Sequence, residues 1–253
     1  FLTIYNMEIV FVLLYNFQPY ILDNIRNCRR FGNNNITVIT DHKFIDEFDC
    51  DIVTVESLVP EYDSLTQNLQ HTFRNGFQQL TSLRFRILYG YMLQHDKKDI
   101  LHLENDVMIF HDFTNFQFHT GKILITMDAI NRSVPGIMYF PSGDIAKTCY
   151  EHFDHTKSDM FNWAYCFHHL RELVDTLPIY VPKTKNWDSA ADKWDFQLVS
   201  NHHAFYNGIF DAAAIGQYLG GIDPRNNESN DPSLKAGLVS KDCIINYATQ
   251  DIV

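Results

Sequence analysis

The sequence has no hydrophobic run long enough to cross a membrane and no cysteine pattern typical of a metal site or a disulfide framework. Its first apolar run, from Ile9 to Tyr15, spans about seven residues, whereas a membrane helix needs roughly 20. No signal-peptide pattern precedes that run. The five cysteines are odd in number, widely spaced and without a C-x-x-C pair. These absences predict a soluble, cytoplasmic protein whose thiols are reduced.

Basic residues are also in short supply. Lysine and arginine number 20 against 31 aspartates and glutamates, which gives a formal net charge of −11. A protein that binds duplex nucleic acid needs a basic face to neutralise phosphates, so this balance argues against nucleic acid as a partner. The 253 residues are enough for one sizeable core, and a single domain is therefore expected.

The first part of the chain alternates between strand and helix patterns. Short apolar runs predict strands at Glu8–Tyr15, Ile36–Thr40 and Ile52–Glu56. Between them, a helical segment opens at Pro19 and continues to Gly32, and a brief helix lies around Phe44–Phe48. Strands that alternate with helices in this order predict right-handed crossovers and a parallel sheet.

A long helical pattern follows, from Ser64 to Gln94, with a possible break at Gly76. Arg84 falls on its apolar stripe, between Leu80 and Ile87. A charged residue on the core-facing side of a helix needs a buried partner. Arg84 could therefore reach a bound phosphate or nearby carboxylates, and a purely structural salt bridge is an equally weighted interpretation.

Two acidic residues interrupt an otherwise strand-like apolar stretch of the chain, Asp99–Phe110. Glu104 and Asp106 sit in it with one residue between them. Unpaired carboxylates are costly inside a core, so we expect the strand to end near Glu104, at the carboxyl edge of the sheet. There the two carboxylates could bind a hard divalent cation, which prefers oxygen ligands and is often shared with phosphates.

Shorter elements are expected after the acidic stretch. Strands are predicted at Lys122–Met127 and Gly136–Phe140, and prolines on both sides of the second favour an antiparallel or edge position. A helix begins at Gly143. Ser158 and Asp159 form an N-cap region for a helix over Met160–Val174.

The remaining expectations concern packing and the C-terminal third. The side chains of the helix after Ser158 that could face the core are Phe161, Tyr165, His168, His169 and Leu173. Leu177–Pro182 is predicted to form a short strand. Trp187–Tyr218 is rich in aromatic residues, which could pack in a core or stack on sugar rings. Asp211 can cap a short helix over Ala212–Leu219.

With these features the chain resembles nucleotide-sugar-dependent glycosyltransferases of the GT-A fold. Glu104-Asn105-Asp106 looks like their D-x-D motif, with Glu in first place, at the end of an apolar strand. Ser82–Arg86 lies in the preceding helix, and Pro135–Pro141 resembles a strand of glycogenin-like enzymes. The resemblance covers roughly Glu8–Pro182, about two thirds of the chain. It implies an α/β fold in which a mixed, Rossmann-like sheet is flanked by helices and a less regular C-terminal segment lies on the acceptor side. Within one domain spanning residues 1–253, residues 8–110 would bind the nucleotide sugar and residues 111–253 the acceptor.

The resemblance also implies a metal site. Asp106 would bind Mn²⁺ or Mg²⁺, and Glu104 would contact the same site through a metal-bound water or the ribose. Asn105 would lie among the contacts to the nucleoside-diphosphate sugar. Many GT-A enzymes add a histidine ligand near the C-terminus, but the last histidines here are His202 and His203. The metal therefore has one of these as a ligand, or only acidic protein ligands, or a ligand beyond the sequence.

Further contacts to the donor are expected where strands end. Tyr15 and Asn16 lie at the end of the first strand and Asp41 at the end of the second, and all three would line the nucleotide crevice. Arg84 would place a fixed positive charge beside the diphosphate.

Two acids are candidates for catalysis on the acceptor side, Asp159 and Asp211. An inverting enzyme needs a carboxylate base for the acceptor hydroxyl, whereas a retaining enzyme does not. Helix capping is the competing interpretation of each residue, and the stereochemical outcome stays open. The acceptor is expected to be a glycan or another hydroxyl compound.

Two rival functions remain. A sugar nucleotidyltransferase would share the fold and the metal, but it would ordinarily carry a Gly-rich, basic phosphate loop after the first strand. The corresponding residues here, Tyr15–Pro19, contain neither glycine nor lysine. The other rival is a non-catalytic carbohydrate-binding protein with a degenerate transferase fold. The joint presence of Glu104, Asp106 and Arg84 favours an enzyme.

Overall fold

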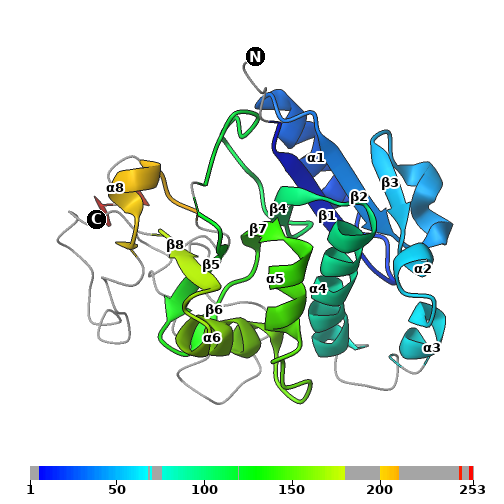
Figure 1. The fold of residues 1–253 in the computed structure, drawn as a ribbon. Coiled ribbons are helices and arrows are strands. Elements are labelled where there is room, and N and C mark those ends of the chain that lie inside the picture. Colours follow the sequence, from blue (N-terminus) through cyan, green and yellow to red (C-terminus); the bar gives the residue numbers. More distant parts are fainter. Residues whose placement is uncertain are drawn as a thin grey trace.

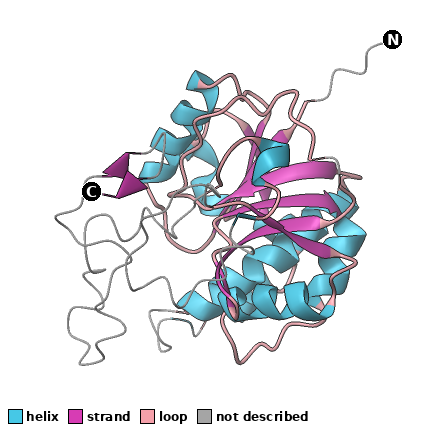
Figure 2. Cartoon of the chain, turned by 90° about the vertical axis from the view of Figure 1, so that its left-hand side faces the viewer, coloured by secondary structure: helices cyan, strands magenta, loops and turns pink. Residues whose placement is uncertain are grey.

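The computed structural model describes residues 6–67, 69, 76–118, 120–179, 200–210, 245–246 and 251–252. One mixed sheet forms its centre, with helices on both sides of the strands (Figures 1 and 2). The strands of this sheet are β1 (Glu8–Leu13), β2 (Ile36–Thr40), β3 (Asp51–Thr54), β4 (Lys98–Leu103), β5 (Ile123–Ala129), β6 (Arg132–Ser133), β7 (Ile137–Ser142) and β8 (Val174–Leu177). Two short strands, β9 (Ile245–Asn246) and β10 (Asp251–Ile252), pair separately.

The described helices connect these strands. They are α1 (Tyr20–Arg30), the 3₁₀ helix η1 (His42–Glu47), α2 (Val55–Leu58), α3 (Tyr62–Thr66), α4 (Phe77–Gln94), α5 (Gly143–Tyr150), α6 (Asp159–His169) and α8 (His203–Tyr206). None of the helices in the described part of the chain is long and apolar enough to span a membrane.

The strand order is β3-β2-β1-β4-β7-β5-β6, with β8 paired to β5. Strands β1 to β4 are mutually parallel, which confirms the parallel sheet predicted for the first half. β7 is antiparallel to both β4 and β5. The prolines around β7 favoured either an antiparallel strand or an edge strand. The structure shows an antiparallel strand, and β7 lies inside the sheet between β4 and β5.

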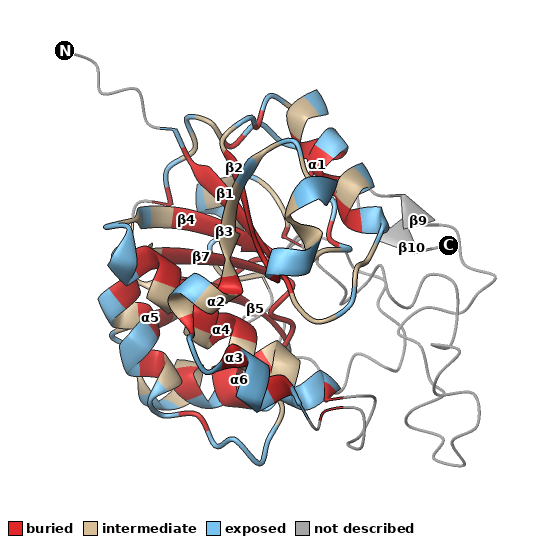
Figure 3. Ribbon diagram, turned by 90° about the vertical axis from the view of Figure 1, so that its right-hand side faces the viewer, coloured by how far each residue is buried: buried red, intermediate tan, exposed pale blue. Residues whose placement is uncertain are grey.

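Each face of the sheet carries its own hydrophobic cluster. Alternate residues of β1 face opposite ways, so Ile9, Phe11 and Leu13 pack with α1 while Val10 and Val12 pack with α4, α5 and α6. This double burial explains why β1 is apolar from Ile9 to Leu13. Figure 3 shows the central strands as buried and the edge strand β3 as largely intermediate.

Two glycines stand where helices end or begin. Gly32 (φ +89°) follows α1, and Gly76 (φ +81°) precedes α4. Both φ values lie in the left-handed region that glycine adopts without a steric penalty. The break predicted at Gly76 is therefore confirmed: α3 ends at Thr66, and α4 starts at Phe77.

The helix predicted over Met160–Val174 needs two corrections. The helix α6 ends at His169, and Val174 begins β8. Its predicted core face is also wrong, because Phe161 is 41% exposed and Tyr165 38% exposed. The residues of α6 that are buried instead are Asp159, Asn162, Trp163, Ala164 and Cys166. Trp163, absent from the predicted set, packs edge-on against Phe85 of α4.

Candidate functional site

The order in which the chain adds strands to the sheet reverses between β1 and β4. From β1 the chain passes through α1 to β2 and β3 on one side, and then returns to β4 on the other side of β1. Ligands of open α/β sheets bind outside the carboxyl ends of the strands at such a switch point. Here the carboxyl ends are Leu13 and Leu103. The residues that follow them, 14–19 and 104–106, form the candidate site.

β4 ends immediately before Glu104, as the sequence predicted. The chain then turns, and the Val107 N–H donates to the Glu104 carbonyl at 3.1 Å. This acidic turn, residues 104–106, carries two different carboxylates. The Glu104 side chain is directed into the protein and is 32% exposed, whereas Asp106 is exposed.

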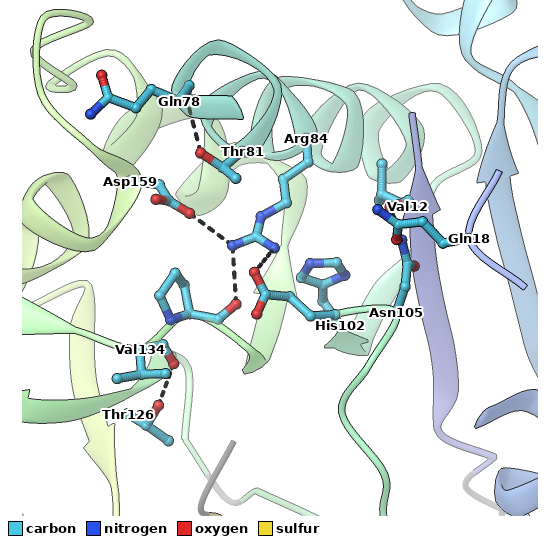
Figure 4. Close-up of polar contacts among 12 residues, drawn as sticks. Val12, Gln18, Gln78, Thr81, Arg84, His102, Asn105, Thr126, Val134 and Asp159 are labelled. Atoms are coloured by element: carbon cyan, nitrogen blue, oxygen red, sulfur yellow. Dashed lines mark hydrogen bonds and ion pairs between the residues drawn. The ribbon is translucent and has the colours of Figure 1, made fainter. Parts of the chain in front are cut away.

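Arg84 joins Glu104 to a second acid from a distant part of the chain. Its Nη1 pairs with Glu104 Oε1, and its Nη2 lies 2.8 Å from Asp159 Oδ2. The same Nη2 also donates to the Pro135 carbonyl at 3.3 Å. Figure 4 shows the guanidinium of Arg84 directed at the carboxylate of Asp159. Arg84 and Asp159 are 6% and 5% exposed. Of the partners expected for Arg84, a phosphate or nearby carboxylates, the structure shows the carboxylates, and its role toward a donor stays a prediction.

The charges of this acidic triad, Glu104, Arg84 and Asp159, shift its protonation equilibria. Burial raises the pKa of Glu104, and Arg84 opposes that rise. Although burial favours the neutral form of Arg84, Glu104 and Asp159 hold its pKa above the usual value. With one guanidinium and two carboxylates, the triad has a net charge of −1 when all three groups are ionised, and Asp106 adds another negative charge.

A buried histidine completes the surroundings of Arg84. His102 of β4 is 1% exposed, and its Nδ1 lies 2.9 Å from the Val10 carbonyl. Its Nε2 is buried and has no hydrogen-bond partner among the described residues. Burial, together with the charge of Arg84, lowers the pKa of His102 to about 3. The imidazole is therefore neutral and adds no positive charge to the site.

Amide side chains hold the acidic turn in place. Asn105 donates to the Val12 carbonyl at 3.3 Å and to Gln18 Oε1 at 2.9 Å, which ties the turn to the end of β1 (Figure 4). Asn24 of α1 donates to the Val107 carbonyl at 2.6 Å. Asn105 Oδ1 and Asn24 Oδ1 are both buried, and neither has a donor within the part of the chain that the structure describes. The turn is thus fixed from the sheet and from α1.

The ends of β1 and β2 meet beside the turn. Asp41 Oδ2 accepts a hydrogen bond from the Tyr15 N–H at 2.7 Å and from the Tyr62 hydroxyl at 3.1 Å. Tyr15 has φ +68°, an uncommon backbone conformation for a residue with a side chain. Lys43 donates to the Tyr15 carbonyl at 2.7 Å. Burial raises the pKa of Asp41, although the Tyr15 N–H opposes the rise.

The structure places most of the predicted site residues at this edge. Tyr15 and Asn16 follow β1, Asp41 follows β2, and the acidic turn follows β4. Their roles in binding remain predictions. Asp211, the other acid predicted for catalysis, lies outside the described residues.

A divalent cation fits the acidic turn only in a restricted way. Glu104 is occupied by Arg84, which leaves the exposed Asp106 as the carboxylate best placed to bind a cation. In the described part of the chain, no three histidine, cysteine or acidic residues cluster as metal ligands. His202, one of the two histidines considered as a further metal ligand, instead lies beside Asp175, with 3.1 Å between its Nε2 and Asp175 Oδ2. Mg²⁺ is often held by one or two carboxylates together with substrate phosphates, and this donor set suits that mode.

Sequence reasoning missed Asn24 and Asn27 of α1. Asn27 donates to the Ile109 carbonyl at 2.6 Å, two residues beyond the carbonyl that Asn24 contacts. Asn33 continues the series with the His111 carbonyl at 2.8 Å. The signal was present in the sequence, because Asn24 lies on the stripe of Ile21, Ile25 and Cys28. An amide on the apolar side of a helix needs a buried partner.

Comparisons with known proteins give distant similarities. No protein-family model matches the sequence, and no curated protein matches it. Solved structures that match include the PaToxG glycosyltransferase, with 10% identity, a TM-score of 0.41 and coverage of 65% of this chain and 70% of that one. The glycosyltransferase GlyE of Streptococcus pneumoniae TIGR4 has 10% identity and a TM-score of 0.45, with coverage of 77% of this chain and 51% of GlyE. This chain therefore spans about half the length of GlyE.

A third structure is a cytidylyltransferase from Leptospira borgpetersenii, with 8% identity, a TM-score of 0.37 and coverage of 68% of this chain and 76% of that one. The mixed sheet with helices on both faces agrees with the α/β fold predicted from the sequence.

Proposed function

We propose that this protein is a glycosyltransferase that moves a sugar from a nucleoside-diphosphate sugar to a hydroxyl acceptor, with Mn²⁺ or Mg²⁺ as cofactor. The observation that carries the proposal is the acidic turn at the switch point. It presents Asp106 outward, while Arg84 neutralises its neighbour Glu104. The GT-A resemblance of the sequence supplies the reaction class.

The charge of the site supports a cation between protein and donor. When all four groups are ionised, the triad and Asp106 together carry two net negative charges, and a diphosphate placed directly against them would be repelled. Both terminal nitrogens of Arg84 are bound to protein oxygens, so Arg84 does not offset that repulsion by itself. When bound, the cation supplies Lewis-acid stabilisation to the departing nucleoside diphosphate.

The chain's own residues then position the donor. Asp106 holds the cation, and the hydrogen bonds of Asn24 and Asn105 fix the backbone that carries Asp106. The loop at Tyr15 and Asn16, fixed by Asp41, forms the opposite wall for the nucleotide. The donor lies at the carboxyl ends of β1 and β4.

Asp159 is suited to hold Arg84, because its carboxylate is buried and paired. The predicted acid-base role of Asp159 or Asp211 is tested by comparing turnover in Asp159→Asn and Asp211→Asn. If neither variant is slowed by at least about tenfold, neither residue is the base.

The proposed function is tested by release of nucleoside diphosphate from a panel of UDP-sugars and GDP-sugars, with and without Mn²⁺. We expect metal-dependent release from one donor class and its loss in Asp106→Asn. Asp112→Asn is the matched control, because Asp112 is an exposed aspartate after the same turn and can keep its contact with the Thr114 N–H. The proposal is wrong if no nucleotide binds under any metal condition. It is also wrong if pyrophosphate is released from a nucleoside triphosphate and a sugar phosphate.

A further inference from the structure

A cavity of about 540 Å³ lies on the α1 side of the acidic turn. Its lining residues come from α1 and from the chain just after β4: Tyr20, Asp23, Asn24, Arg26, Asn27, Arg30, Asn105, Asp106 and Met108. We call it the α1 groove. A volume of this size is in the range of small-molecule and cofactor sites. Asp106 belongs to both the groove and the candidate site, so the two are continuous.

The direction of the groove follows from the topology. α1 connects the parallel strands β1 and β2, so it starts at their carboxyl edge and runs back toward their amino ends. The chain after β4 runs beside α1 in the same direction, because Asn24, Asn27 and Asn33 contact the carbonyls of Val107, Ile109 and His111 in turn. From Tyr20 to Arg30 the helix rises by about 15 Å. The groove therefore leads away from the carboxyl edge.

The buried amides of Asn24 and Asn27 bridge the two sides of the groove and form its floor. Asn24 is 1% exposed, and its Oδ1, like the Oδ1 of Asn105 near Asp106, is buried with no hydrogen-bond donor among the described residues. Because both oxygens are closed to solvent, they belong to the floor of the groove and do not themselves contact a ligand in it.

The walls combine apolar and charged groups. Tyr20 is 45% exposed and Met108 is 49% exposed, which gives an aromatic ring and an apolar chain at the surface. Arg26 pairs with Asp23, whereas Arg30 has no ion pair with any residue that the structure describes. A sugar chain fits this surface, because sugar rings stack on aromatic faces and their hydroxyls form hydrogen bonds with exposed polar side chains such as those of Asp106 and Arg30. Arg30 adds a site for an acidic group at the far end.

The nucleotide is a poorer occupant of this groove. Nucleotides of open α/β sheets bind at the carboxyl ends of the strands, and the groove extends from that edge along α1. A nucleic acid is disfavoured by the net charge of −11. A long, uncharged or weakly acidic ligand whose end lies near Asp106 matches both the position and the chemistry.

We propose that the α1 groove binds the acceptor, a sugar chain that carries an acidic group, with its reacting end near Asp106 and the acidic group at Arg30. This inference rests on the proposed function and deepens it by naming the acceptor class. It also moves part of the acceptor site into residues 8–110, which the sequence assigned to the nucleotide sugar alone.

The test uses a printed array of neutral and uronate-containing oligosaccharides, probed with the full chain. We expect the wild-type protein to retain uronate-containing chains, and retention to fall by at least about tenfold, or 1.4 kcal/mol, in both Tyr20→Ala and Arg30→Ala. Arg29→Ala is the matched control. Arg29 neighbours Arg30 on α1 but pairs with Asp49 and does not line the groove, so its retention should equal that of the wild type.

Binding of UDP and GDP with Mn²⁺ is measured on the same wild-type sample by calorimetry. If nucleotide binds but no oligosaccharide is retained, or if Arg30→Ala and Tyr20→Ala retain the chains as the wild type does, the groove proposal is overturned and the proposed function stands. Retention of neutral chains alone also overturns it. Absence of nucleotide binding overturns the proposed function itself.

Discussion

The two sides of the acidic turn are held by different interactions, a buried ion pair on the inner side and neutral amides on the α1 side. On the inner side, Glu104 is stabilised by a buried charge, because Arg84 pairs with it and with Asp159. On the α1 side, neutral amides of Asn24 and Asn27 hold the backbone by its carbonyls, and Asp106 forms no ion pair with any residue that the structure describes. Two carboxylates only two residues apart can therefore differ in role, one in the ion pair and one available to a cation.

Removal of the buried charge of Arg84 should have the largest effect on the stability of the protein. In Arg84→Met the carboxylates of Glu104 and Asp159 lose their partner, and we expect the free energy of unfolding to fall by about 3 to 5 kcal/mol. Denaturant unfolding measures the loss. Arg86→Met is the control on the same helix, because Arg86 pairs with the exposed Glu61, and such pairs contribute about 1 kcal/mol or less. Equal losses in the two variants would contradict the buried role of Arg84.

A second prediction uses pH on the inner side. The pKa of His102 is about 3 in the folded protein, and its ordinary value is about 6.5. Between these two pH values the unfolded chain binds more protons at this residue than the folded protein does. The stability that the neutral His102 contributes is therefore fully present above pH 6.5 and is lost as the pH falls toward 3. Between pH 7 and pH 4 the wild type should lose about 3 kcal/mol more stability than His102→Gln.

The pH measurement compares the two proteins at each pH by denaturant unfolding. Asp41 and Glu104 have raised pKa values and act in the opposite direction, but they are present in both proteins and cancel in the difference. A difference that does not change with pH would mean that His102 is not buried in its neutral form.

The smallest expected effect lies on the amide side. Asn27→Ala removes the donor to the Ile109 carbonyl in a buried position and should lower the free energy of unfolding by about 2 kcal/mol. Asn34→Ala, in which an exposed contact with the Gly32 carbonyl is lost, should change stability by less than about 0.5 kcal/mol. Thermal or denaturant unfolding of both variants compares them. If Asn27→Ala is as stable as Asn34→Ala, the amide series does not hold the chain after β4.

Much of the fold was predictable because it rests on local patterns. The apolar run of β1, the strand β2 and the break at Gly76 are read from neighbouring residues alone. The position of β7 in the sheet was not predictable, because prolines restrict the hydrogen bonds of a strand but do not determine which strands lie beside it. The core face of α6 was missed for a related reason. The apolar Phe161 and Tyr165 suggested one face, whereas the contacts of Asp159 with Arg84 and of Trp163 with Phe85 set another.

The candidate site was predictable in part. The burial of Arg84 followed from its place on the apolar stripe of its helix, and the acidic turn followed from carboxylates in an apolar strand. That Asp159 is the second partner of Arg84 did not follow, because 75 residues separate them and only the packing of α6 against α4 brings them together. The amide contacts of Asn24 and Asn27 depend in the same way on the path of the chain after β4.

The central claim is that Asp106 holds the cation while Glu104 serves the ion pair. It is tested most directly by calorimetric titration of the wild type, Asp106→Asn and Glu104→Gln with UDP and GDP, in the presence and absence of Mn²⁺. We predict that Mn²⁺ strengthens nucleotide binding in the wild type and in Glu104→Gln, and that this gain is lost in Asp106→Asn. Loss of the gain in Glu104→Gln together with its persistence in Asp106→Asn would contradict the account.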